Sequence, residues 1–344
     1  MENSTESIDQ RIRSVFAVAG LPRVTAIRGL AGDASNRSYY RCMVDSDMSY
    51  IAMVNAAPDK AIVSEEIAAH ARGFEEMPFI NIQRYLAHLR VRVPAIHYND
   101  REAGILILED LGDALLGDII NSSGPSDELY QKAIDMMLQF QVREEQVPAW
   151  CYARLNRFNS SLYDFEFGHF VEYGIAKVGV VLPNNVLSKL QKLFHRLSVL
   201  FERYATVFVH RDYHSRNLLY CTGQLYTIDF QDALIGAPQY DLASLLRDAY
   251  VELTDDFVDR MVEYYLSKSP HASAGFRDVF TLLSIQRMLK AAGRFRYIKL
   301  VKGNDKFMRY IPGLLRRVKQ LSLSYRSDPA LEVIAEVIDR IPAG

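Results

Sequence analysis

The segment from residue 210 to residue 232 constrains this chain more than any other, because a polar loop leads directly into a hairpin. The loop reads His-Arg-Asp-Tyr-His-Ser-Arg-Asn and ends at Asn217. Two short apolar segments follow, and the turn Thr222-Gly223 joins them. Such a pattern predicts a β-hairpin. Antiparallel pairing would return Asp229 to within about one pairing step of Asn217. The sequence therefore predicts that two oxygen-bearing side chains meet at the open end of one hairpin.

The same loop has the residue pattern of a phosphoryl-transfer site. In the pattern His-Arg-Asp-x-x-x-x-Asn, the aspartate accepts the proton of the substrate hydroxyl and the asparagine holds a metal ion. Those positions are Asp212 and Asn217 here, and Asp229 supplies the second metal ligand after an apolar strand. Two hard oxygen ligands suit Mg²⁺, which keeps several waters and binds substrate phosphates. Each residue alone would be interpreted as a turn-former, but the complete set at this spacing favours catalysis.

Composition sets broad limits on the class of protein. The chain has 344 residues, of which 49% are apolar and 24% charged, as in a globular protein with a substantial core. The net charge of −2 gives no basic field for nucleic acid. Three scattered cysteines, a polar N-terminus and the lack of a membrane-length apolar run predict a cytoplasmic protein with no membrane partner.

The distribution of apolar residues predicts an α+β fold with two lobes. Residues 1–112 mix strands with one or two helices, and the last strand, Ile105–Leu108, ends abruptly at Glu109-Asp110-Leu111-Gly112. Residues 113–344 are mainly helical, with apolar stripes at helical spacing after Ser126 and after Pro183. We expect a small β-rich N-terminal lobe that ends in a hinge, and a larger helical C-terminal lobe that carries the chemistry.

Six stretches together resemble the aminoglycoside phosphotransferase and choline kinase superfamily, which shares the protein-kinase-like fold. They are Gly32–Arg41, Leu108–Gly112, His210–Asn217, Ile228–Ala233, Tyr240–Asp248 and Gln286–Lys290. The catalytic loop is specific to the superfamily. The Gly-Asp-Ala-Ser, Asp-Phe-Gln-Asp and Gln-Arg-Met-Leu-Lys segments resemble one branch, the anomeric N-acetylmuramate and N-acetylglucosamine kinases of cell-wall recycling.

The resemblance implies a role for each matching position of the catalytic loop and hairpin. Asp212 would orient and deprotonate the sugar hydroxyl, while Asn217 and Asp229 would hold Mg²⁺ on the phosphates of ATP. Asp241, on the following helix, would hold the backbone of the catalytic loop. His210 would be a packing and hydrogen-bonding residue of the loop rather than an acid or base.

For the nucleotide, the resemblance implies a hinge and a turn. The backbone from Glu109 to Leu111 would pair with adenine. The turn over the phosphates would consist of Gly32, Asp33, Ala34 and Ser35, with only one glycine. Hydroxyl and backbone N–H groups would then make the phosphate contacts. Read without the resemblance, this turn is a hairpin connection.

One departure concerns the lysine that protein kinases carry on a strand of the small lobe. The corresponding strand includes Ile51–Val54, with Val54 at the lysine position, and Lys60 lies beyond a proline. Arg37 or Arg41 could supply the charge, since both share a strand face with Tyr39. A solvated strand face is the alternative.

The acceptor site is expected at His214, Glu166 and Arg247. Arginine suits a carboxylate such as the lactyl group of N-acetylmuramate. Structural ion pairs for Glu166 and Arg247, and a solvated loop position for His214, are the alternatives. Basic residues at helical spacing between residues 287 and 302 indicate a solvated face or the rim of a site for an anionic ligand.

These observations predict an ATP- and Mg²⁺-dependent kinase that phosphorylates the anomeric hydroxyl of N-acetylmuramate or N-acetylglucosamine. A sugar-1-phosphate nucleotidyltransferase would be its neighbour in the pathway. One alternative is an aminoglycoside or choline-like acceptor, although few acids gather beyond Asp164, Glu166 and Glu172. The other is a nucleotide-binding scaffold without turnover, against which the retention of all three catalytic-site residues argues.

Overall fold

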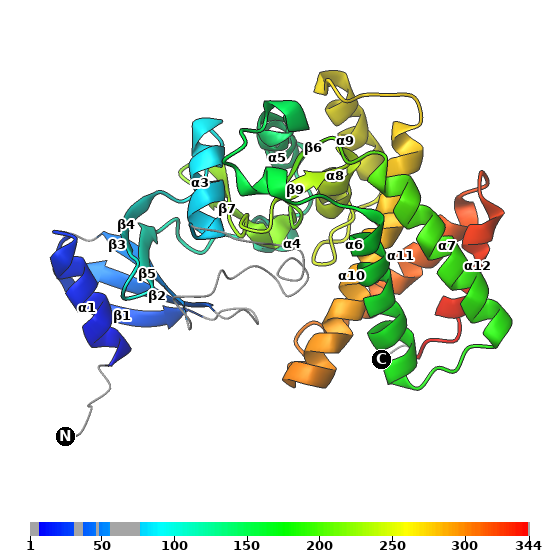
Figure 1. The fold of residues 1–344 in the computed structure, drawn as a ribbon, viewed down its shortest axis with the longest axis horizontal. Coiled ribbons are helices and arrows are strands. Elements are labelled where there is room, and N and C mark those ends of the chain that lie inside the picture. The colour runs from blue at the N-terminus through cyan, green and yellow to red at the C-terminus, as the bar shows by residue number, and fades with distance from the viewer. Residues whose placement is uncertain (1–6, 31–36, 46–47, 56–75, 343–344) are drawn as a thin grey trace.

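The computed structural model describes residues 7–30, 37–45, 48–55 and 76–342. The expected phosphate turn, Gly32–Ser35, and Lys60 lie outside these residues. Figure 1 shows a twisted sheet with helix α1 (Ile8–Val18) at one end of the molecule and a larger, mainly helical body at the other. This arrangement confirms the α+β fold with two lobes, while a boundary at residue 112 stays a prediction.

The N-terminal lobe is built on a five-stranded antiparallel sheet in the order β1-β2-β3-β5-β4. The strands are β1 (Val24–Leu30), β2 (Arg37–Val44), β3 (Ser49–Asn55), β4 (Ile96–Asp100) and β5 (Ile105–Glu109). The apolar segment Ile105–Leu108 therefore forms a strand as predicted, and it lies next to β3 inside the sheet. Its residues are buried because both faces of the sheet are covered.

Val54 of β3, which the sequence placed at the position of the missing lysine, does not face the helical lobe. Ala52 and Val54 pack in the apolar core under α1, on the face of the sheet turned away from the helical lobe. Met53 instead belongs to the large core that extends into the helical lobe, as does Tyr39 on β2 through its packing. Because side chains alternate between faces, the position facing the other lobe is Met53 and not Val54.

Arg41 on β2 fastens the sheet to the hinge. Its Nε lies 2.6 Å from a carboxylate oxygen of Asp110, and its Nη1 lies 2.7 Å from one of Asp113. Ser49 donates a hydrogen bond of 2.6 Å to Asp110 from the next strand. The guanidinium of Arg41 is thus committed to the hinge.

The helical body is formed around α10, a long helix that packs against α6, α8 and α11. The principal helices after the sheet are α4 (Leu116–Ser123), α5 (Asp127–Phe140), α6 (Ser160–His169), α7 (Asn184–Glu202), α8 (Gln239–Leu246), α9 (Asp255–Lys268), α10 (Phe276–Lys302), α11 (Ile311–Ser324) and α12 (Glu332–Ile338). Helix α3 (Pro78–His88) lies between the sheet and this body (Figure 1). Ser126 caps α5 through the amide of Leu129, and the apolar stripes predicted for α5 and α7 are largely buried.

The catalytic loop lies between two small pairs of strands, after a strand of one pair and before a strand of the other. Strand β6 (Val207–Val209) pairs with β9 (Leu234–Gly236), and β7 (Leu218–Cys221) pairs with β8 (Gln224–Thr227). The connecting residues Thr222 and Gly223 both have positive φ, 47° and 81°. Two such residues are what a two-residue hairpin with the right-handed strand twist requires.

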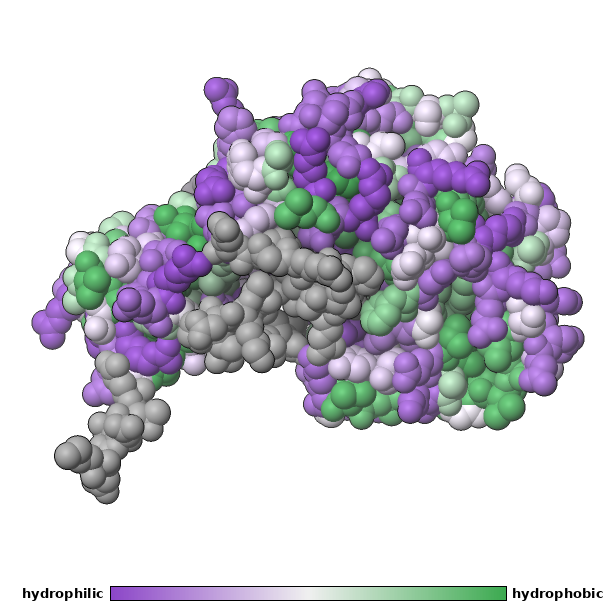
Figure 2. Space-filling view, viewed as in Figure 1, coloured by the Kyte–Doolittle hydropathy of each residue, from purple (hydrophilic) through white to green (hydrophobic). Residues whose placement is uncertain are grey.

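In the view of Figure 2, hydrophilic residues predominate among the residues that the structure describes, and apolar residues form patches between them. Within the described part of the chain, no helix combines the length and the apolar character needed to span a bilayer.

Candidate active site

The hairpin brings its two predicted metal-binding residues to one end. Leu218 is paired with Thr227, and the amide of Ile228 donates a hydrogen bond of 3.0 Å to the carbonyl of Asn217. Asp229 follows with a φ of 62°, a left-handed conformation that aspartate tolerates better than most residues. The hairpin geometry inferred from the sequence is confirmed.

Asp241, at the start of α8, holds the backbone of the catalytic loop in place through hydrogen bonds. Its carboxylate is fully buried and accepts hydrogen bonds from the amides of His210 and Arg211, at 2.7 and 3.0 Å. His210 packs beside it with Nε2 at 3.0 Å from the carbonyl of Ile228. Burial lowers the pKa of His210 to about 4, so the ring is neutral and donates this bond. Both residues have the structural roles expected of them.

Asp212 lies against two cations of α10, Arg287 and Lys290, and the sequence did not predict this contact. One carboxylate oxygen of Asp212 is 3.1 Å from Nη2 of Arg287 and 3.8 Å from Nζ of Lys290. Burial alone would raise the pKa of Asp212, but the charges of Lys290 and Arg287 hold it well below its usual range. Asp212 is therefore ionised, and with 32% of its side chain exposed it can still meet a substrate.

Arg287 and Lys290 both belong to the basic residues between positions 287 and 302, for which the sequence indicated either a solvated face or the rim of a site for an anionic ligand. The solvated-face interpretation holds for the exposed Lys299 but is wrong for Arg287 and Lys290, whose side chains are only 10% and 15% exposed. Arg296, also buried, holds the carbonyl of Gly174. The sequence signal was present in Gln-Arg-Met-Leu-Lys, where the basic residues are three positions apart and share one helix face.

Glu166 of α6 lies behind Asp212 and is 1% exposed. It accepts charge-assisted bonds from Arg211 at 3.1 Å and Lys290 at 2.9 Å, and Gln286 donates to it at 2.7 Å. Burying a carboxylate is tolerable only with such partners. Glu166 was expected at the acceptor, but this burial assigns it to positioning Lys290 instead.

The open end of the hairpin has the donor atoms that suit Mg²⁺. Asn217 donates its amide to the carbonyl of Asp212 at 2.8 Å, which leaves its side-chain oxygen as the atom able to bind a cation. The carboxylate of Asp229 is half exposed and is oriented by Gln231 at 2.9 Å. No cluster of three or more acidic, histidine or cysteine ligands occurs among the described residues. A site with two oxygen ligands, completed by phosphates and water, fits this arrangement.

Arg37 of β2 lies next to that site. Its Nη1 lies 4.0 Å from a carboxylate oxygen of Asp229, and its side chain is 6% exposed. Because Arg41 is held at the hinge, Arg37 is the one of the two expected arginines that is directed to the hairpin.

The hinge segment was expected to pair with adenine through its backbone from Glu109 to Leu111. The amide of Glu109 already donates a hydrogen bond of 2.9 Å to the carbonyl of Ala95. Leu111 follows at the end of the hinge segment.

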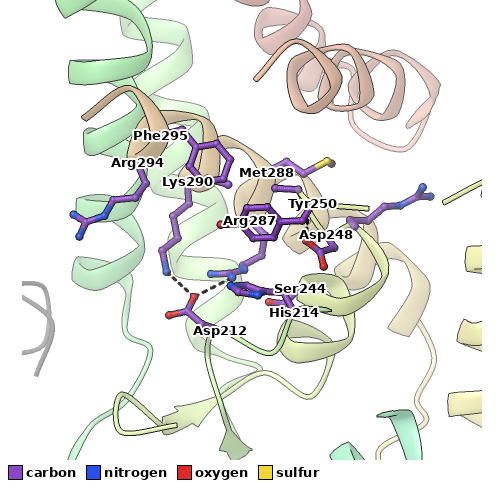
Figure 3. Close-up of a pocket in the computed structure, with 13 residues that line it drawn as sticks. Asp212, His214, Ser244, Asp248, Tyr250, Arg287, Met288, Lys290, Arg294 and Phe295 are labelled. Atoms are coloured by element: carbon purple, nitrogen blue, oxygen red, sulfur yellow. Dashed lines mark hydrogen bonds and ion pairs between the residues drawn. The ribbon is translucent and has the colours of Figure 1, made fainter. Parts of the chain in front are cut away.

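A pocket of about 150 Å³ lies beside Asp212, between the catalytic loop, the end of α8 and helix α10 (Figure 3). The catalytic loop contributes His214, the end of α8 contributes Arg247 and the segment after it Asp248, and α10 supplies most of the opposite wall. Arg247 is held by Asp255 at 2.8 Å. Of the three residues expected at the acceptor, the pocket therefore brings together His214 and Arg247, next to Asp212.

Comparison with known proteins places the chain in a family of phosphotransferases. The chain matches the model of the phosphotransferase enzyme family over residues 26–276. It is 30% identical over 322 residues to a protein of Neisseria meningitidis serogroup B named N-acetylmuramate/N-acetylglucosamine kinase, covering 90% of this chain and 89% of that one. A protein of the same name from Pseudomonas aeruginosa is 29% identical, covering 91% and 88%.

Solved structures show the same fold at low identity. A choline kinase from Streptococcus pneumoniae has a TM-score of 0.61 at 16% identity, covering 92% of this chain and 99% of that one. An ADP-bound aminoglycoside phosphotransferase has a TM-score of 0.59 at 15% identity, covering 96% and 99%. The fold and the catalytic loop thus agree with the match to the family model, and the chain belongs to the phosphotransferase enzyme family, as a small-molecule kinase.

Proposed function

We propose that this protein transfers the γ-phosphoryl group of ATP, with Mg²⁺, to the anomeric hydroxyl of N-acetylmuramate or N-acetylglucosamine. The acceptors named for its relatives and the residues around Asp212 support this proposal. The product would be a sugar 1-phosphate, which a nucleotidyltransferase would consume.

The charge of the pocket is the observation that carries the choice of acceptor. Its two carboxylates are already engaged, Asp212 by the cations of α10 and Asp248 by the amides of Ser215 and Tyr250, both at 2.8 Å. Basic side chains predominate among the remaining charged groups of the wall. Aminoglycosides are polycations and would meet repulsion here. A neutral or anionic acceptor fits better.

The aromatic residues beside the pocket argue against a choline-like acceptor as well. A quaternary ammonium is bound by the faces of aromatic rings. Here the guanidinium of Arg216 lies 4.7 Å from the centre of the Tyr250 ring and 5.8 Å from that of Phe307. An internal cation thus already occupies one face of the Tyr250 ring, which is part of the pocket wall.

Catalysis in this proposal is mainly orientation and charge neutralisation. Asp212 would accept a hydrogen bond from the sugar hydroxyl and align its oxygen with the γ-phosphorus. Because its pKa is lowered, Asp212 is a weak base. The proton of the sugar hydroxyl would therefore be transferred to it only late in the reaction, which a loose transition state allows. Arg37 would supply positive charge at the phosphates in place of the strand lysine.

The nucleotide would be held by three parts of the N-terminal lobe and hairpin. Asn217 and Asp229 would bind Mg²⁺, which neutralises the phosphate charge when bound. The hinge backbone at Leu111 would pair with adenine. The contacts of Gly32–Ser35 with the phosphates stay a prediction from the sequence.

The proposal is tested by measuring ADP formation with defined acceptors. N-acetylmuramate or N-acetylglucosamine should stimulate it, whereas the methyl glycosides should not, because they lack the anomeric hydroxyl. Kanamycin and choline serve as controls and should give no comparable rate. Equal rates with a methyl glycoside and the free sugar would show attack at another hydroxyl. Nucleotide binding without turnover on any acceptor would favour a scaffold.

A pH profile tests the role of the α10 cations. Removing one cation beside an aspartate raises its pKa by about 1 unit or more. We therefore expect Lys290→Met to move the acid limb of kcat/KM upward, towards the ordinary aspartate pKa of about 4. In the unaltered protein that limb should lie at lower pH, because Asp212 stays ionised there. The exposed Lys299→Met is the matched control, and superimposable profiles for all three proteins would contradict the assignment.

A further inference from the structure

We propose that Arg294 binds a carboxylate on the acceptor, so that the enzyme favours an acidic amino sugar over a neutral one. This inference rests on the proposed function and specifies which group of the acceptor is recognised. The two sugars named for the relatives differ by a lactyl ether, whose carboxylate is present only in N-acetylmuramate.

The first support is the balance of charge along α10. Arg287, Lys290 and Arg294 all line the pocket, at spacings that place them on one face of the helix. The first two are neutralised by Asp212, and Lys290 also by Glu166. Within the part of the chain that the structure describes, no carboxylate forms an ion pair with Arg294. Arg294 therefore leaves a positive charge on this wall without an acidic partner.

The second support is the way in which Arg294 is held. Its guanidinium carbon lies 4.9 Å from the centre of the Tyr297 ring. A cation–π contact of this kind does not use the N–H groups in the plane of the guanidinium, which stay available for hydrogen bonds. Those groups form the fork that binds a carboxylate through two parallel hydrogen bonds. Arg247, the arginine expected from the sequence, is instead paired with Asp255.

The third support is the separation of Lys290 and Arg294 along α10. Figure 3 shows Lys290 and Arg294 projecting from the same stretch of α10, with Lys290 directed at Asp212. Four residues of helix rise by about 6 Å, comparable with the length of one sugar ring. An acceptor with its anomeric hydroxyl at Asp212 carries its lactyl ether on O3 of the same ring, and a separation of this size would allow the lactyl carboxylate to reach Arg294.

The experiment compares N-acetylmuramate with its carboxyl methyl ester in the full-length protein. The quantity measured is the ratio of kcat/KM for the acid to that for the ester. A charge-assisted hydrogen bond of this kind corresponds to roughly 10- to 100-fold in that ratio. We expect Arg294→Gln to lower the ratio by about this factor, mainly through KM for the acid, and Arg294→Lys to give an intermediate value.

The controls separate this inference from the proposed function. Lys299→Gln, on an exposed position of the same helix, should leave the ratio unchanged. An unchanged ratio in Arg294→Gln, an equal loss for acid and ester, or an increase confined to the KM for ATP would overturn the role of Arg294 while leaving the sugar kinase intact. Absence of turnover with either amino sugar in the unaltered protein would overturn the proposed function itself.

Discussion

Replacing Asp212 with asparagine should lower kcat by roughly 10²- to 10⁴-fold, the contribution of a positioned acid–base group. Asparagine keeps the size of the side chain but presents an N–H donor to Arg287 and Lys290 and cannot take the proton of the acceptor. The KM for ATP should stay within a few-fold. The side chain of Asp212 contacts the α10 cations, and the hydrogen bond from Asn217 goes to the backbone carbonyl of Asp212, which the substitution keeps.

Steady-state ADP formation at saturating acceptor, together with nucleotide binding by calorimetry, would measure both quantities. Asp118→Asn, at an exposed position of α4, is a matched control that should retain full activity. A turnover within a few-fold of the unaltered protein would remove Asp212 from the mechanism. Loss of nucleotide binding together with turnover would instead indicate a disordered loop.

The second large effect is expected at Asp229. Asp229→Asn should reduce Mg²⁺-dependent turnover by about two to three orders of magnitude, since a metal at the phosphates contributes several kcal/mol of charge stabilisation. Asparagine is preferred to alanine here because the residue has a φ of 62°, which asparagine adopts readily. The carboxylate is half exposed, so the melting temperature of the nucleotide-free protein should change little.

Calorimetric titration of ATP with Mg²⁺, and again with a chelator, would test this assignment. In the unaltered protein the two affinities should differ, and in Asp229→Asn the difference should be largely lost. Normal Mg·ATP binding by the variant would refute the role of Asp229 as a metal ligand.

Much of the catalytic loop could be predicted because its geometry is local. The hairpin depends on a turn and on alternation over about ten residues, and both are visible in the sequence. The position of Asp229 beside Asn217 follows from that pairing alone. The strand that includes Ile51–Val54 was predicted correctly for the same reason. Periodicity alone does not state which face of that strand meets the other lobe, and Val54 packs on the face turned away from it.

The acceptor side depends instead on contacts between distant segments. Arg287 reaches Asp212 across 75 positions of sequence, and Gln286 reaches Glu166 across 120. Helix α10 is buried along much of its length by α6, α8 and α11, so its pattern does not reveal which side faces the site.

The sequence by itself thus determined the loop, the hairpin, the class of chemistry and the α+β architecture, because short-range pairing and residue type are sufficient for them. Only the tertiary structure decided that Glu166 lies behind Asp212, that Arg41 is held at the hinge, and that α10 provides the cations beside Asp212. Those positions result from the packing of helices and strands on one another, and the partners of a charged side chain are set by what that packing brings within a few ångströms.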